Sequence, residues 1–370
     1  MSTPPSPPGT ERPDGSAVRI GALVPLTRPG WVEAGRHLLA GLELAVREVN
    51  DAGGIGGRPL ELVVRDTAAD PQRAVAAVDE LARLGVAAVA GEYHSVVARA
   101  AAGRADALGL PFLCSSAVLD ALTEQPTEWV ARLAPAQSRG WQIYADFLLG
   151  AGHSRIAVAA QSSVYWASGV RVLRDYLAPR GGTVIELDMG VLTPATVCDE
   201  LVGDRATALL LLVGHPEPAV SIVESVRRDP RLAEIMIGAP AGQPEFAVWA
   251  RSLGGDGAAI PFLRYLPERL SPLGARVEAA LRERLAEAPS FVAFEGYDTV
   301  AVLAEVLRSH GTDRARIAAS WARVAVEGAR GQIRFSRTAG ISVWQWAWAP
   351  VQVVDRDPAE PDRFRILHTG

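Results

Sequence analysis

Short apolar runs alternate with amphipathic segments along most of this chain. In the stretch 85–123, apolar runs at 86–90 and 111–114 flank an alanine-rich segment at 96–108. Glycine or proline bounds each run, and this order is typical of parallel strands joined by a crossover helix. Ligands of such sheets bind beyond the carboxyl ends of the strands. The polar loops 91–95 and 115–119 both follow a predicted strand, so we expect a binding site there.

The same alternation continues on both sides of this stretch. Further strands are expected at 18–24, 60–65, 153–160, 183–187, 207–213, 235–238, 257–263 and within 332–354. Helices are expected between them and at 272–286, 291–310 and 313–324. The pattern predicts an α/β fold of two doubly wound, Rossmann-like lobes with a cleft between them. The glycine run at 53–57 leaves a helix and enters a strand, which is the wrong order for a dinucleotide-binding loop, so we interpret it as a turn.

Composition narrows the possible functions. The chain has 370 residues, enough for two domains, and its net charge of −5 argues against nucleic acid as a direct partner. All 37 basic residues are arginines, which excludes a Schiff-base lysine and a lysine-containing phosphate loop. No apolar run approaches the roughly 20 residues that span a bilayer, so no membrane insertion is expected.

Cysteine and histidine spacing gives no sign of a metal or a nucleophile. Cys114 and Cys198 lie in apolar segments, and we expect both to be buried free thiols. The six histidines show no metal-binding spacing. We therefore expect no catalytic residue, no metal and no cofactor.

Several side chains in the loops after the strands are candidates for the site. Ser95 is expected to cap the helix 96–108 and to leave free backbone N–H groups facing a ligand oxygen. His94 beside it, and His215 at the corresponding edge of the second lobe, either contact the ligand or are simply solvated. Trp31 and Trp166, one in each lobe, either form cleft walls or are ordinary packing residues. Trp344, Trp346 and Trp348 alternate along the late strands and favour packing or a partner surface over chemistry.

The chain resembles type I periplasmic binding proteins, most closely the leucine/isoleucine/valine-binding and amide-binding branches. The resemblance is carried by VRIGALVPLT, GLELAVREVNDAGGIGGRPLELVVRDTAADPQRAV, GEYHSVVARAAA and LGLPFLCSSA, and it extends over residues 18–348. It implies two lobes joined by a three-segment hinge. The N-terminal lobe is expected at 18–135 plus 264–335, and the C-terminal lobe at 136–263 plus 336–370. The proline-rich residues 1–17 are expected to be a disordered tail.

The resemblance also implies roles for particular residues. Ser95 stands at the family's ligand-binding serine, Tyr93 fits the G-x-Y-x-S form of the amide-binding branch, and Tyr165 stands where a tyrosine closes over the ligand. Ser116 and Ala117 fall in a loop that holds the ligand through backbone groups. Three positions depart from the family. Val118 replaces a threonine that holds an α-carboxylate, Ala241 a glutamate that holds an α-ammonium, and Ala34 an aromatic residue.

These departures favour a neutral or anionic ligand, because an unpaired ammonium in a dry cleft costs several kcal/mol. We expect a non-catalytic solute-binding protein of the ABC-transporter type, whose ligand is a small amide, urea-like compound, carboxylic acid or amino acid. Its partner is then an ABC permease. The alternative is a cytosolic ligand sensor that regulates gene expression through a partner protein, and a more remote one is a nucleotide-using α/β enzyme. The sequence as written has no signal peptide and predicts a cytoplasmic protein, or one outside the membrane if the start is misassigned.

Overall fold

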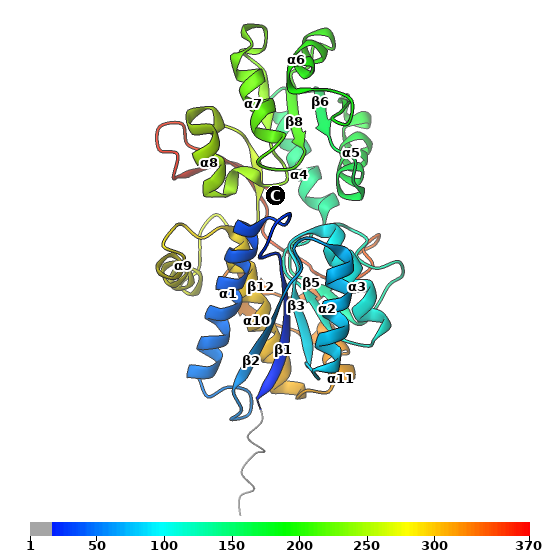
Figure 1. The fold of residues 1–370 in the computed structure, drawn as a ribbon, viewed down its shortest axis with the longest axis vertical. Coiled ribbons are helices and arrows are strands. Elements are labelled where there is room, and N and C mark those ends of the chain that lie inside the picture. Colours follow the sequence, from blue (N-terminus) through cyan, green and yellow to red (C-terminus); the bar gives the residue numbers. More distant parts are fainter. Residues whose placement is uncertain (1–16) are drawn as a thin grey trace, which may run out of the picture.

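The computed structural model describes residues 17–370, so the tail expected at 1–17 lies, except for Ala17, outside the described residues. Two α/β lobes are stacked one above the other along the long axis (Figure 1). The lower lobe contains the N-terminal strands and helices, and the upper lobe contains the middle of the chain. This arrangement confirms the α/β, doubly wound fold.

The first lobe is built on a seven-stranded sheet in the order β13-β14-β5-β4-β3-β1-β2. Its strands are β1 (Val18–Val24), β2 (Leu60–Asp66), β3 (Ala88–Gly91), β4 (Phe112–Cys114), β5 (Val130–Arg132), β13 (Phe335–Ser336) and β14 (Trp344–Trp346). All neighbours pair in parallel except β13 and β14. The polar loops after β3 and β4 therefore lie at one edge of the sheet, as the pattern predicts.

Helices cover both faces of this sheet. On one face lie α1 (Val32–Asp51) and α10 (Phe291–His310), which pack against each other, and on the other lie α2 (Pro71–Arg83) and α3 (Ser95–Ala107) (Figure 1). Helix α2 begins where the Asp70 carboxylate accepts hydrogen bonds from the amides of Gln72 and Arg73. The lobe also contains α9 (Pro272–Leu285), α11 (Arg314–Ala318) and the small pair β11 (Val326–Gly328) and β12 (Gly331–Ile333).

The second lobe has a four-stranded parallel sheet in the order β7-β6-β8-β9, beside a three-stranded sheet in the order β10-β15-β16. The strands are β6 (Arg155–Ala160), β7 (Thr183–Asp188), β8 (Ala208–Leu212), β9 (Met236–Gly238), β10 (Phe262–Arg264), β15 (Gln352–Arg356) and β16 (Phe364–Thr369). Its helices are α4 (Gln137–Gly150), α5 (Val164–Leu177), α6 (Pro194–Gly203), α7 (Ala219–Arg228) and α8 (Ala247–Leu253). The chain passes between the lobes after β5, after β10 and after β14.

The late segment differs from the expected domain division. Residues 336–370 were expected in the second lobe, yet β14 pairs with β5 in the first sheet, with Trp344 opposite Ala131. The side chain of Gln345 holds this pairing, because it accepts a hydrogen bond from Arg132 and donates one to the carbonyl of Ala134. The alternating pattern predicts a strand but does not specify its partner, so the crossing into the second lobe comes later than expected.

Two other expectations are wrong in detail. The strand expected at 257–263 is mostly irregular, because a 3-10 turn (Gly254–Gly257) precedes β10. The helix expected at 313–324 shortens to α11 followed by a 3-10 turn (Trp321–Arg323). The glycine run at 53–57 is a turn between α1 and β2, as expected.

Both cysteines are buried free thiols, as predicted. Burial raises the pKa of the Cys114 thiol to about 12, and its sulfur donates a hydrogen bond to the carbonyl of Ala117. A thiol with such a high pKa is not ionised at neutral pH and is a poor nucleophile. This environment agrees with a structural role for Cys114.

Candidate functional site

A cavity of about 250 Å³ lies between the two lobes, at the carboxyl ends of the strands. Its lining comes from the first lobe, the second lobe and the crossings between them. The lining residues are Trp31, Ala69, Tyr93, His94, Ser95, Val96, Val97, Ser116, Val118, Ser163, Tyr165, Trp166, Ala241, Tyr265 and Phe291. None of these residues is an arginine, an aspartate or a glutamate, so the cavity has no ion-pair partner for a charged ligand.

The start of α3 forms one end of the cavity. The amides of Ser95, Val96 and Val97 belong to the first turn, where backbone N–H groups have no acceptor within the helix. All three residues line the cavity. These amides and the positive end of the helix can therefore receive a ligand oxygen.

Ser95 has a different role from the expected cap. His94 is the N-cap residue and makes no side-chain cap, while the buried carboxylate of Glu92 accepts the amides of Tyr93 and His94 at 2.8 Å each. The Ser95 hydroxyl instead accepts hydrogen bonds from the amides of Val118 and Leu119, at 3.2 and 3.3 Å. Ser95 thus joins the loop after β3 to the loop after β4, which the local helix-start pattern could not predict.

His94 is fixed by two hydrogen bonds. Its Nε2 accepts the Trp31 amide at 3.3 Å, so the ring proton is on Nδ1, which lies 3.3 Å from Glu92 Oε1. Both ring nitrogens are therefore occupied within the protein. His94 lines the cavity with its ring and has no free nitrogen for a ligand.

Aromatic rings form most of the walls. Trp31 contacts Tyr93 edge-on, with ring centres 5.8 Å apart, and Phe246 at 4.9 Å. In the second lobe, Tyr165 packs on Trp166 at 4.6 Å. Near the crossings, Tyr265 packs on Phe291 at 5.0 Å. Burial raises the pKa of Tyr93, Tyr165 and Tyr265, so their hydroxyls stay neutral.

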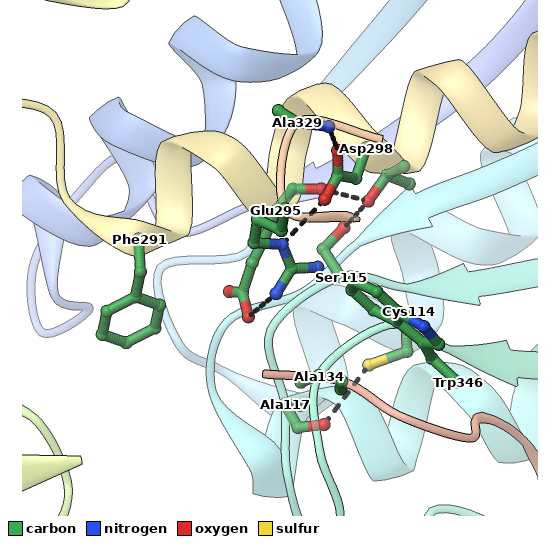
Figure 2. A network of polar contacts seen from close by, with 12 residues as sticks. Cys114, Ser115, Ala117, Ala134, Phe291, Glu295, Asp298, Ala329 and Trp346 are labelled. Atoms are coloured by element: carbon green, nitrogen blue, oxygen red, sulfur yellow. Dashed lines mark hydrogen bonds and ion pairs between the residues drawn. The ribbon is translucent and has the colours of Figure 1, made fainter. Parts of the chain in front are cut away.

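Two buried carboxyl groups lie behind the cavity wall. Glu245 is held by Arg264 at 2.9 Å and by the Phe291 amide at 2.9 Å, and burial raises its pKa. Glu295, on α10, is fully buried and contacts Arg330 at 3.2 Å (Figure 2). Burial raises the pKa of Glu295 to about 7, although Arg330 opposes this shift.

The structure brings most of the predicted site residues together. The predicted residues that line the cavity are Trp31, Tyr93, His94, Ser95, Ser116, Tyr165 and Trp166. Val118 and Ala241, two of the positions that depart from the family, line it as well. Ala117 does not line it, because its side chain packs in the core between the sheet and α3. Ala34 is also fully buried in the core, on α1, so this position is not a wall.

His215 lies outside this cavity. It lines a second cavity of about 300 Å³ on the other side of Trp31, together with Glu33, Arg28, Arg36 and Arg251. The His215 and Trp31 rings lie 5.5 Å apart. The cleft therefore has an uncharged compartment and a charged one, with the Trp31 indole between them.

Sequence reasoning missed two lining residues, Tyr265 in the crossing after β10 and Phe291 at the start of α10. Neither follows a strand of the two parallel sheets, so the rule that places ligands at strand ends does not find them. Val96, Val97, Ala69 and Ser163 were missed as well. Ser163 carries a local signal, because it caps α5 by accepting the Trp166 amide at 3.0 Å.

Two α/β lobes with a small enclosed cavity at helix N-termini define a class of proteins that hold a small molecule between lobes. A family model for periplasmic binding proteins matches residues 17–355. The chain therefore belongs to the periplasmic binding protein family.

Curated relatives match parts of the chain. Leu/Ile/Val-binding protein homolog 1 of Brucella abortus (strain 2308) is 36% identical over 80 residues, which is 22% of this chain and 21% of the relative. Leu/Ile/Val-binding protein homolog 7 of Brucella melitensis biotype 1 is 30% identical over 179 residues, which is 46% of this chain and 44% of the relative. The chain thus matches less than half of the length of either relative.

Solved structures match nearly the whole chain. The leucine-binding protein LivK from Thermotoga maritima is 20% identical with a TM-score of 0.81, over 95% of this chain and 97% of that one. LivJ from Streptococcus pneumoniae, in complex with isoleucine, is 20% identical with a TM-score of 0.80, over 96% and 100%. A solute-binding protein from R. palustris, in complex with benzoate, is 18% identical with a TM-score of 0.79, over 96% of both chains. At these identities the likeness shows a shared fold.

No helix within residues 17–370 combines the length and the apolar character needed to cross a membrane.

Proposed function

We propose that this protein is a non-catalytic solute-binding protein that holds a small amide or carboxylic acid between its lobes. The observation that carries this proposal is the composition of the cavity, which offers first-turn amides of α3 at one end and aromatic rings around the rest. Amides at a helix N-terminus suit a carbonyl or carboxylate oxygen. The rings suit a flat or apolar ligand body.

The same cavity disfavours an α-amino acid. No carboxylate of residues 17–370 lines it, and Ala241 and Val118 offer only apolar surface at two positions where the resemblance implies polar side chains in amino-acid binders. A ligand ammonium would be buried there without a partner, at a cost of several kcal/mol. The relatives named for leucine, isoleucine and valine therefore differ from this chain in the ligand that we propose. The benzoate complex of the R. palustris protein provides a closer ligand analogue.

The partner follows from the same proposal. Solved proteins of this fold are described as substrate-binding or solute-binding proteins of ABC transporters, so we propose an ABC permease as the partner. The regulator alternative predicts the same cavity and a different partner. Co-purification with a permease, as opposed to a regulatory protein released by ligand, separates the two.

A thermal-shift panel tests the ligand class. Benzamide, benzoate, short aliphatic amides and acids, and α-amino acids are added to the purified protein, and the mixtures are then examined for chemical change by mass spectrometry. Saturation at about 100 times Kd stabilises a protein by about 2.7 kcal/mol, which gives a clear rise in Tm. We expect a rise with at least one amide or acid, no rise with α-amino acids, and unchanged ligand.

Two variants test, in the same panel, whether the cavity wall selects the ligand class. Ala241→Glu places a carboxylate in the cavity, so we expect weaker binding of acids and a gain for α-amino acids. Gly103→Ala, on a side of α3 with open space, is the matched control and should leave the panel unchanged. A panel in which no amide or acid raises the Tm contradicts the proposal, and so does turnover of any bound compound.

A further inference from the structure

Two buried carboxyl groups, those of Glu295 and Asp298, share the one positive charge of Arg330. Glu295 and Asp298 are one turn apart on α10, both are fully buried, and both contact the same guanidinium, that of the buried Arg330 (Figure 2). Asp298 has the stronger contacts, at 2.8 Å to Arg330 Nε and 2.6 Å to the Ala329 amide, against 3.2 Å for Glu295. One extra proton would balance the charge, and the weaker contacts assign it to Glu295.

One oxygen of Glu295 has no hydrogen bond. Oε1 accepts from Arg330, whereas Oε2 is buried without a partner in the part of the chain that the structure describes. Figure 2 shows the Glu295 carboxyl on the side of α10 that carries Phe291, four residues earlier, and Phe291 lines the cavity. A buried carboxylate oxygen without a hydrogen bond costs free energy, and a hydrogen bond shared with a neighbouring group removes that cost.

Ser116 is a neighbour of Glu295 and also has a buried polar atom without a partner among the described residues. It lies in the loop after β4 and lines the cavity, and its buried Oγ has no hydrogen-bond partner of full geometry within residues 17–370. It is nevertheless close enough to Glu295 to lower the pKa of that carboxyl. A serine hydroxyl has one O–H to donate and two lone pairs, so its role depends on the proton of its neighbour.

The other titratable groups packed around Glu295 do not compete with it for the extra proton. Helix α10 and the β11–β12 turn contribute Asp298 and Arg330, which pair with each other, and the 3-10 turn after β9 contributes Glu245, which pairs with Arg264. The remaining groups are Tyr93, Tyr265 and Cys114, whose pKa values are all raised by burial. These three stay neutral near pH 7. Burial also raises the pKa of Asp298 and Glu245, but their shorter contacts with Arg330 and Arg264 leave Glu295 as the carboxyl that takes the proton.

We propose that Glu295 and Ser116 form a proton relay that sets whether the cavity accepts a hydrogen bond from its ligand or donates one to it. With Glu295 ionised, the Ser116 hydroxyl donates to Oε2 and presents a lone pair to a ligand N–H. With Glu295 protonated by a proton from water, its O–H donates to Ser116 Oγ, and the Ser116 proton turns toward a ligand oxygen. Amides are then preferred at higher pH, and carboxylates at lower pH.

This inference rests on the proposed ligand-binding function, and its first test needs no ligand. Infrared titration of the carboxyl C=O band should give a midpoint of about 7 for Glu295 in the ligand-free protein. Glu295→Gln should remove the band. Ser116→Ala should raise the midpoint, because the serine lowers this pKa, and Asp298→Asn should lower it, because the Asp298 charge raises it. An unchanged midpoint in Ser116→Ala overturns the relay.

The second test uses benzamide and benzoate as a pair of similar shape. Calorimetry is done about one pH unit below and above the measured midpoint. The ratio of the benzamide Kd to the benzoate Kd should fall roughly tenfold with rising pH in the wild type, the effect of one hydrogen bond to a charged group. Glu295→Gln should give a constant ratio. Ser116→Ala should give a reduced change, because only direct charge repulsion remains.

The outcomes separate the two proposals. A constant ratio in the wild type, or the full change in Ser116→Ala, overturns the relay even where binding is normal. Absence of binding by every compound in the panel refutes the proposed function, while the infrared titration still decides whether Ser116 and Glu295 share a proton.

Discussion

Burial sets the protonation of single residues around the cleft. The ring of His215 lies between Trp31 and Trp249, with centres 5.5 Å from each, and neither ring nitrogen has a hydrogen-bond partner among the described residues. Burial lowers the pKa of His215 to about 4. The folded protein therefore holds this histidine neutral at a pH where the unfolded chain takes up a proton.

This residue makes a prediction on acid stability. Because the folded pKa is lower than the ordinary value near 6.5, the unfolded chain binds more protons between about pH 6.5 and 4. The stability associated with neutral His215 is complete above about pH 6.5 and is lost as the pH falls toward 4, by at most about 3 kcal/mol. In His215→Gln, which cannot take a proton, urea unfolding at pH 7 and 4.5 should show a smaller loss than the wild type. An equal loss of stability in the wild type and in His215→Gln contradicts this prediction.

Close contact between two helices organises the first lobe. Helices α1 and α10 cross at glycines, and a Cβ added to Gly296 would meet the carbonyl oxygen of Leu38 at 2.3 Å. A Cβ on Gly41 would likewise meet backbone atoms of α10. This approach holds α10 against α1, and α10 carries Phe291 to the cavity and Glu295 to a buried position behind its wall.

The close crossing of α1 and α10 predicts that one added methyl group at the contact destabilises the protein. Gly296→Ala should destabilise the protein by about 1–3 kcal/mol, because backbone atoms of α1 must shift. Gly103→Ala on α3 has nothing within 4 Å of the added atom and should stabilise the protein by up to about 1 kcal/mol, the difference in helix propensity. Chemical denaturation of both variants measures the difference, and similar midpoints would contradict the close packing.

At the scale of the whole molecule, the two lobes differ in how far each depends on distant parts of the chain. The first sheet needs β13 and β14 and the cover of α10, all of which come after the four-stranded sheet of the second lobe in sequence. One core of the second lobe, which includes Trp249 and Leu211, is formed entirely by residues 157–260.

This difference predicts the behaviour of fragments. A fragment of residues 17–135 lacks the strands and the helix that complete its sheet, and it should show no cooperative unfolding by circular dichroism. A fragment of residues 137–264 retains the four-stranded sheet and its helices and should unfold cooperatively. Cooperative unfolding of the first fragment alone would contradict the shared-lobe arrangement.

Local patterns by themselves determined the α/β class, most element positions and the edge of the sheet where the cavity lies. Residues 18–24 and 291–310 were predicted at the bounds that β1 and α10 have, because periodicity and capping act within a few neighbours. The resemblance to periplasmic binding proteins, confirmed by the family match, also came from contiguous segments. Trp31, Tyr93, Ser95 and Tyr165 were predicted from such local segments, and all four line the cavity.

Only the tertiary structure decided which groups meet. It pairs β14 with β5, joins the Ser95 hydroxyl to the loop after β4, places His215 in a separate cavity, and brings Phe291 and Tyr265 to the wall of the first cavity. The unpartnered oxygen of Glu295 near Ser116 is likewise absent from any sequence pattern. Burial and contact between distant residues depend on how the helices and sheets pack, and a local pattern carries no record of that packing.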